Sequence, residues 1–447
     1  MRKRISFVFL SFFFLIALCS CQRRNVLLFL NWGEYVDEDM LQEFESLYHC
    51  EVAMELGESN ELFYSKISAG TTCFDVMCPS DYMVLKMAQN DMLQEIDFSR
   101  VPNYKPEDRM PGVKGIADTL ESKMSGITSY YVPYLWGTWG IVYSTYKEGL
   151  KEAVTTSSNE WASLFDRSSL PAGTRVAMYD SNLHAYYAAC RYLGFDTEAE
   201  LTKAELNQIY SLIRNMKYET WGTDDIKKDI VAKNRDLGFM WTGDFLYYYC
   251  ENVASTVMDA YLAKDVEIND FSTMVETITT DAGIYKDKYQ VGFDIFIPSN
   301  TIAFCDNFVI PKHAANYDLA LEFINFMCGR DEGPNHADPA LKNTYYVSYN
   351  APYVGLYEDI VSLKNVEFSA NDLEGFSTDG AYDSDLFWKI YDMAIGIAFD
   401  KYYPKEEKII LPDGKEKHYK GDILATFSRK YINTINSTFN NAKAKAN

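Results

Sequence analysis

Residues 28–40 read LFLNWGEYVDEDM, and this stretch indicates both a fold and a binding site. An apolar strand ends at Asn31, and an amphipathic helix begins near Asp37. The turn between them presents an indole, a carboxylate and a phenol, from Trp32, Glu34 and Tyr35. Ligands of open α/β sheets bind at the carboxyl ends of strands, and aromatic rings beside an acid suit an organic cation. The stretch therefore predicts a site for a cationic small molecule.

The same order of strand, polar loop and helix recurs along the chain. Apolar runs predict further strands over residues 51–54, 74–78, 175–179 and 237–240. The loops after four strands carry polar or aromatic side chains, and they include Trp32, Ser80, Tyr82, Ser181, His184, Trp241 and Asp244. Two of these loops lie early in the chain and two lie late. This pattern predicts two α/β lobes that face each other across a cleft.

Two long apolar stretches, 130–143 and 301–311, are predicted to be extended and to cross between the lobes as hinges. The first lobe would then comprise residues 25–136 plus 305–352, and the second 137–304 plus 353–447. Segment 247–290 is expected to add helices to the second lobe. Asp413-Gly414 indicates a β-hairpin, and the tail after Asn436 is expected to fray.

The first twenty residues are typical of an export signal. Three basic residues precede an apolar run over residues 5–18 that is too short for a membrane span. The run ends in LCSC at 18–21, which resembles a bacterial lipobox and predicts a lipid on Cys21. A plain secretory signal is the alternative. The chain is expected to be a periplasmic lipoprotein that meets the membrane only through its lipid anchor.

Composition restricts the class of function. A net charge of -22 argues against nucleic acid and anionic membrane surfaces as partners, and it favours the approach of cations. Cys19 falls in the signal, and the odd number of cysteines after Cys21 requires a free thiol if pairing is internal. No zinc-ligand spacing, phosphate-binding loop or nucleophile motif occurs. We expect no metal, no cofactor and no catalytic residues.

Several motifs, in order from about Leu27 to Asn350, carry a family resemblance. They are NWGEYV at 31–36, ESNE at 58–61, FDV with PSDY at 74–82, MLQEID at 92–97, PYLWGT at 133–138, WASL at 161–164, MWTG at 240–243, DNFVIP at 306–311 and LEFINF at 321–326. The chain resembles the extracytoplasmic spermidine/putrescine-binding proteins of bacterial ABC importers. The resemblance implies a two-lobed, type II-like periplasmic-binding-protein fold, a polyamine ligand and an ABC permease as partner.

The resemblance also implies roles for matching residues. Trp32, Tyr35, Tyr82 and Trp241 would line the cleft, and Phe304 stands where the family has tryptophan. Glu34 and Asp306 match acids that pair with ammonium groups. Ser80 would make one hydrogen bond, and Tyr346 matches a tyrosine of the second crossing region.

The chain departs from the family directly after the strand predicted at 175–179. There, Ser181 and His184 stand where the family has two acids. Three explanations stay open: the ligand is the shorter diamine putrescine, Asp244 substitutes for the lost acids, or the ligand is not a polyamine. Asp244 can also be interpreted as a helix cap, and His184 as a surface histidine.

Two further functions are alternatives to transport. Glu34 and Asp306 could serve as the acid and base of a carbohydrate-active enzyme, whose sugar cleft the aromatic residues would suit. A lipid-anchored sensor or adhesin could keep the fold and bind another ligand.

Overall fold

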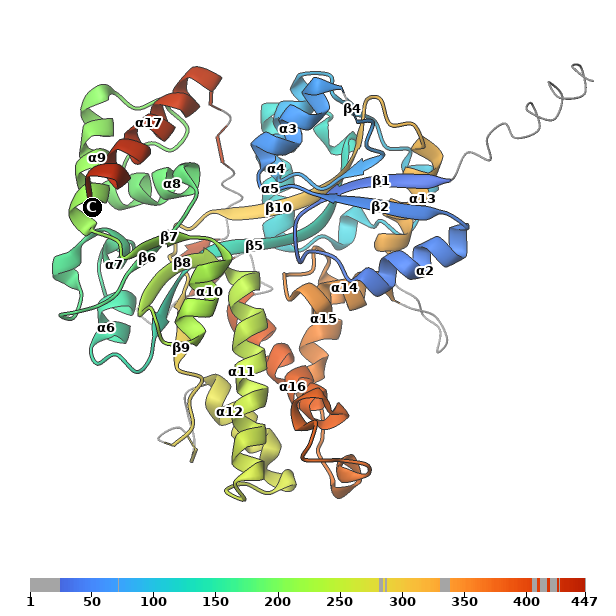
Figure 1. The fold of residues 1–447 in the computed structure, drawn as a ribbon. Coiled ribbons are helices and arrows are strands. Elements are labelled where there is room, and N and C mark those ends of the chain that lie inside the picture. The colour runs from blue at the N-terminus through green and yellow to red at the C-terminus, as the bar shows by residue number, and fades with distance from the viewer. Residues whose placement is uncertain are drawn as a thin grey trace, which may run out of the picture.

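The computed structural model describes residues 25–446, apart from 71, 281–283, 286–287, 330–337, 404–407, 411–415, 419–423 and 426. The signal sequence and Cys21 lie outside these residues. Figure 1 shows two groups of helices and strands, with the two long strands β5 (Tyr131–Ser144) and β10 (Ala303–Pro311) running between them. Both predicted crossings are therefore confirmed as extended segments.

The first group is built around β1 (Val26–Asn31), which pairs in parallel with β2 (Glu51–Leu56) and β3 (Val76–Met77). The helices of this group are α2 (Glu38–Tyr48), α3 (Asn60–Ala69), α4 (Asp81–Gln89), α5 (Pro111–Lys123), α13 (Tyr317–Met327) and α14 (Pro339–Val347). Asp37 caps α2 and Ser59 caps α3, because each side chain accepts a hydrogen bond from a backbone N–H of the first turn. The strand–loop–helix order predicted from the sequence is confirmed here.

One sheet connects the two groups. Its strand order is β2-β1-β3-β10-β5-β8, with β4 (Leu93–Gln94) on β10 and β9 (Phe293–Phe296) on β5. Strand β5 pairs with β10 along its first half and with β8 (Leu237–Trp241) and β9 along its second half. All residues of β5 except Ser144 are buried. This strand therefore belongs to both halves of the molecule.

The second group carries the small parallel sheet of β6 (Ala177–Tyr179) and β7 (Thr220–Gly222). The helices around it are α6 (Leu150–Thr155), α7 (Ala162–Phe165), α8 (Asn182–Leu193), α9 (Lys203–Met216), α10 (Asp224–Val231) and α17 (Arg429–Ala446). Helix α17 lies beside α8 and α9 (Figure 1), so the expectation that the tail frays was wrong. The polar composition of the tail conceals an apolar stripe at helical spacing, formed by the buried Tyr431, Ile435, Phe439 and Ala442.

Four further helices form a layer below the sheet in Figure 1: α11 (Thr242–Leu262), α12 (Phe271–Thr280), α15 (Val354–Ser362) and α16 (Asp385–Tyr402). Helices α11 and α12 confirm that segment 247–290 adds helices, and both pack against α16. Short 3-10 helices cover Phe98–Arg100, Pro106–Asp108, Ile127–Ser129, Arg167–Ser169, Ile268–Asp270, Leu363–Asn365, Ala370–Leu373 and Ala381–Asp383.

Three smaller features complete the fold. Strands β11 (Lys408–Ile410) and β12 (Glu416–His418) pair antiparallel as predicted, although the turn with Asp413 lies outside the described residues. All seven cysteines of the described residues are free thiols, in agreement with the odd count. Among the described helices, none combines the length and apolar character that a membrane crossing needs.

Candidate functional site

The sheet brings Tyr35, Ser80 and Asp306 together from three distant parts of the chain. The Tyr35 hydroxyl donates to Oδ2 of Asp306 at 2.8 Å, and the Ser80 hydroxyl donates to Oδ1 at 2.6 Å. Tyr35 follows β1, Ser80 precedes α4, and Asp306 lies at an irregularity in the pairing of β10 with β5. Asn60, which the sequence did not single out as a site residue, donates from Nδ2 to Ser80 Oγ at 2.9 Å. The carboxylate of Asp306 is thus held in one orientation.

Burial strongly affects the charge of Asp306, which is only 5% exposed. Desolvation raises the pKa of its carboxyl from 3.8 to about 6, although the hydrogen bonds from Ser80 and Tyr35 lower it. Because the folded pKa exceeds the unfolded value, the contribution to stability is complete below pH 3.8 and is lost as the pH rises through about 6. At neutral pH the site therefore holds a poorly solvated negative charge, which a bound cation would stabilise.

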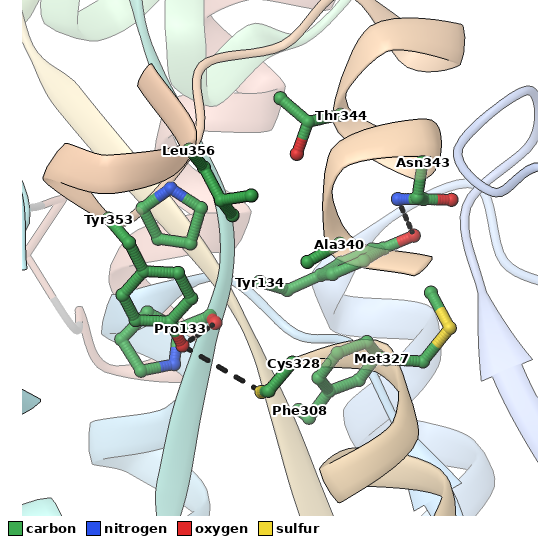
Figure 2. Close-up of a pocket in the computed structure, with 11 residues that line it drawn as sticks. Pro133, Tyr134, Phe308, Met327, Cys328, Ala340, Asn343, Thr344, Tyr353 and Leu356 are labelled. Atoms are coloured by element: carbon green, nitrogen blue, oxygen red, sulfur yellow. Dashed lines mark hydrogen bonds between the residues drawn. The ribbon is translucent and has the colours of Figure 1, made fainter. Parts of the chain in front are cut away.

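The residues that pack against Tyr35 are held by hydrogen bonds of their own. Tyr134 donates its hydroxyl to the backbone oxygen of Tyr35 at 2.5 Å and accepts a hydrogen bond from Asn343 Nδ2 at 2.8 Å. Figure 2 shows Tyr134 and Asn343 at a cavity of about 10 Å³, beside Phe308 and Cys328. A space of this size holds at most one water molecule. The hydrogen bonds of Tyr134 and Asn343 hold the backbone of Tyr35 in place. The cavity beside them is too small for an organic ligand.

The other predicted residues of the first lobe surround this network. The Trp32 ring stacks on Phe63 with centroids 4.4 Å apart, and its Nε1 donates to the backbone oxygen of Cys78 at 2.7 Å. The buried Tyr82 hydroxyl donates to Glu61 at 3.3 Å. Glu34 is exposed, in a left-handed conformation with φ 52°. Trp32 and Tyr82 are therefore held by partners, whereas Glu34 is exposed to solvent.

A second cluster of rings forms around Trp241 at the end of β8. Phe304 packs edge-on against Trp241 with centroids 4.5 Å apart, and His184 and Trp139 contact it at 5.1 and 5.3 Å. Burial lowers the pKa of His184 to about 3, and its Nδ1 is buried without a hydrogen-bond partner in the structure. His184 is therefore a neutral, half-buried member of the ring cluster rather than a fully exposed surface histidine.

Ser181 and Asp244 have structural partners of their own. Ser181 caps α8 by accepting a hydrogen bond from the backbone N–H of His184 at 3.4 Å. Asp244 lies in the first turn of α11 and forms an ion pair with Lys227 at 2.9 Å. The interpretation of Asp244 as a cap was wrong, because α11 has no side-chain cap. Lys227 was missed because it lies on a different helix.

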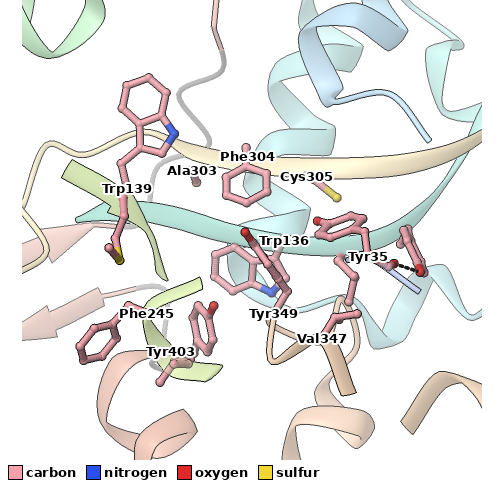
Figure 3. Close-up of a cluster of buried hydrophobic side chains, with 14 of the residues drawn as sticks. Tyr35, Trp136, Trp139, Phe245, Ala303, Phe304, Cys305, Val347, Tyr349 and Tyr403 are labelled. Carbon is pink, nitrogen blue, oxygen red and sulfur yellow. Dashed lines mark hydrogen bonds between the residues drawn. The ribbon is translucent and has the colours of Figure 1, made fainter. Parts of the chain in front are cut away.

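Tyr349 joins the two clusters. Its ring lies 5.0 Å from that of Tyr35 and 6.1 Å from that of Phe304, and Figure 3 shows it among these side chains. Burial, and next the charge of Asp244, hold the pKa of Tyr349 well above its usual value. The predicted contact Tyr346 lies on α14 and is 54% exposed. Its contact with a ligand stays a prediction.

Comparison with known proteins identifies the family. Residues 30–333 match the family model described as bacterial extracellular solute-binding protein. This chain belongs to that family. Among the curated relatives of this solute-binding protein is a putrescine-binding periplasmic protein of Pseudomonas aeruginosa (strain UCBPP-PA14). The two are 27% identical over 310 residues, which cover 68% of this chain and 73% of the relative.

A second relative of the solute-binding protein is a spermidine/putrescine-binding periplasmic protein of Escherichia coli (strain K12). They are 25% identical over 365 residues, which cover 79% of this chain and 89% of the relative. A solved structure from Listeria monocytogenes, described as a putative spermidine/putrescine ABC transporter, aligns with a TM-score of 0.58 and 21% identity. The alignment covers 94% of this chain and 99% of that one. These comparisons confirm the two-lobed periplasmic-binding-protein fold.

The described part of this solute-binding protein contains no group of three or more His, Cys, Asp or Glu side chains that could hold a metal ion. The fold instead gathers aromatic rings around one buried carboxylate. That arrangement suits the binding of an organic cation by charge and ring faces.

Proposed function

We propose that this protein is the substrate-binding component of a polyamine importer, binding putrescine or spermidine in an aromatic, acidic cleft between its lobes. The single observation that carries this proposal is the buried carboxylate of Asp306, oriented by Tyr35 and Ser80 and bordered by aromatic rings. The names of both curated relatives, which include putrescine, support the same class of ligand.

The predicted site residues acquire distinct roles in this proposal. Asp306 pairs with one ammonium group, and Glu34 pairs with another near the protein surface. Trp32, Tyr82, Trp241 and Phe304 contact the methylene groups between them. Ser181 and His184 line the second lobe without charge. Binding makes and breaks no covalent bond, so the proposal excludes an enzyme.

The proposed mechanism is closure of the two lobes about β5 and β10. The lobes are taken as residues 25–136 plus 305–352 and residues 137–304 plus 353–447. Since β5 pairs with strands of both halves, bending near its centre would change the lobe angle while each half keeps its own strand pairs. The closed form would dock on ABC permease subunits. A lipid on Cys21 would hold the protein at the membrane on the periplasmic side.

Calorimetric titration of the chain from Gln22 onwards with putrescine, spermidine and 1,4-butanediol tests the proposal. We expect heat with at least one amine and none with the neutral diol, because the diol cannot pair with Asp306. Absence of heat with both amines would contradict polyamine binding. That result would favour a sensor or adhesin with another ligand.

Binding of putrescine should weaken as the pH falls from 8 to 5. The pKa of Asp306 is about 6, whereas the amines of the ligand stay protonated over this range. At pH 5 only about a tenth of a carboxyl with that pKa is ionised, so affinity should fall about tenfold. Titrations at several pH values measure the profile. A flat profile would show that Asp306 does not pair with the ligand.

A further inference from the structure

A buried ion pair lies in the second lobe at Asp244, the residue that could substitute for the acids missing at Ser181 and His184. Lys227 of α10 places its Nζ 2.9 Å from Asp244 of α11, and their side chains are only 9% and 15% exposed. Helix α10 follows β7, whose parallel neighbour β6 leads to Ser181 and His184. A lysine is rarely buried this far unless a partner holds its charge. Lys227 and Asp244 are therefore a buried charged pair on the two helices that follow strands β7 and β8.

The pair adjoins the candidate site through two tyrosines. The ring of Tyr349, which contacts the ring of Tyr35, is also close enough to Asp244 for that charge to raise the pKa of its hydroxyl. Tyr248 lies on the same helix as Asp244, and burial raises the pKa of its hydroxyl. The charge of Lys227 lowers this pKa, whereas the charges of Glu34, Asp244 and Glu251 raise it. The charges of Lys227, Asp244 and Glu34 thus all act on one phenol.

Two acids of the second lobe are each paired with a lysine of the same chain. Asp180, which directly follows β6, is bonded to Lys443 of α17 at 2.7 Å. Asp244 is bonded to Lys227. In the first lobe, by contrast, Asp306 accepts hydrogen bonds from the neutral hydroxyls of Tyr35 and Ser80. Of the two acids that the proposed function assigns to the ligand, Asp306 and Glu34, neither forms an ion pair with a lysine in the described structure.

We infer that Lys227 is an internal counter-cation that neutralises Asp244 and so makes the site select a diamine over a triamine. Two ammonium groups find carboxylates at Asp306 and Glu34. A third ammonium would have to approach Asp244, where Lys227 already holds the charge and repels another cation. Desolvating that ammonium without a partner is unfavourable. This inference rests on the proposed function.

The test compares Lys227→Met with the wild type and with Lys228→Met, a neighbour on α10 whose side chain is exposed. Removal of the Lys227 charge frees Asp244 for a ligand ammonium. Calorimetry should show that spermidine affinity rises about tenfold or more, the effect of one charge-assisted hydrogen bond. Putrescine affinity should change far less, and Lys228→Met should match the wild type for both amines.

Two further variants make the result decisive. Lys227→Gln removes the charge but keeps a hydrogen-bond donor for Asp244, so it tests the same prediction if Lys227→Met folds poorly by circular dichroism. Lys227→Met combined with Asp244→Asn should lose the gain for spermidine, because the acid is gone.

The outcomes separate this inference from the proposed function. If the wild type binds neither amine, the proposed function fails. If it binds putrescine but the lysine variants keep the wild-type ratio of the two affinities, the inference is overturned and the proposed function stands. Stronger binding of 4-aminobutyrate than of putrescine by the wild type would also overturn it, since Lys227 would then bind a ligand carboxylate.

Discussion

Asp306→Asn should reduce the affinity for putrescine about 100-fold, a loss of about 3 kcal/mol. The substitution removes the buried charge that pairs with a ligand ammonium but preserves the shape of the side chain. The Tyr35 hydroxyl can rotate to accept a hydrogen bond from the new amide, while Ser80 continues to donate to its oxygen. Calorimetric titration at pH 7.5 measures the change.

The unliganded Asp306→Asn protein should be at least as stable as the wild type at this pH. Its carboxyl, with a pKa of about 6, is a buried charge at neutral pH, and the amide removes that charge. Asp91→Asn is the matched control, since that side chain is 82% exposed and pairs with Lys312 at the surface. Unchanged affinity in Asp306→Asn would contradict the role of Asp306. A large fall in the melting temperature would assign the loss to misfolding.

Gly243→Ala should destabilise the protein by about 1–3 kcal/mol, the usual cost of overpacking a core. A Cβ at this position would lie 2.3 Å from Cγ of Tyr349 and within 2.5 Å of two other ring atoms. Since Cγ lies close to the backbone, the ring cannot turn away, and either α11 or Tyr349 must move. Urea unfolding measures the change in free energy, and weaker putrescine binding should accompany it if Tyr349 shifts away from Tyr35.

Gly222→Ala is the control for this substitution, because its nearest neighbour would be at the ordinary distance of 3.5 Å. A double-mutant cycle with Tyr349→Ala identifies the cause. Once the ring is removed, Gly243→Ala should cost little more than Gly222→Ala does. An equal cost with and without the ring would locate the strain elsewhere in α11.

Local patterns in the sequence predict most of the secondary structure around the candidate site. The apolar runs at 26–30 and 237–240 correspond to β1 and β8, and α2 begins directly after Asp37, near the predicted start. Such predictions succeed because strand periodicity and helix capping depend on residues close together in the chain. The stretch 301–311 also corresponds to β10.

The predicted site residues differ in how well their surroundings could be inferred. Tyr35, Ser80 and Asp306 do come together, as do Trp241 and Phe304. The neutral, half-buried state of His184 depends on rings from β5 and β8, which no local pattern reveals. Whether these residues contact a ligand stays a prediction that the titrations test.

The sequence by itself determined the strand–loop–helix order, the aromatic and acidic character of the loops and the excess of negative charge. Only the tertiary structure decided which acids are already paired and which tyrosine joins the two clusters. Lys227 meets Asp244 on the next helix, and Tyr349 meets Tyr35 from a distant part of the chain. The physical reason is that electrostatic pairing and ring packing depend on distance in space, whereas local sequence patterns encode only the contacts of neighbouring turns and strands.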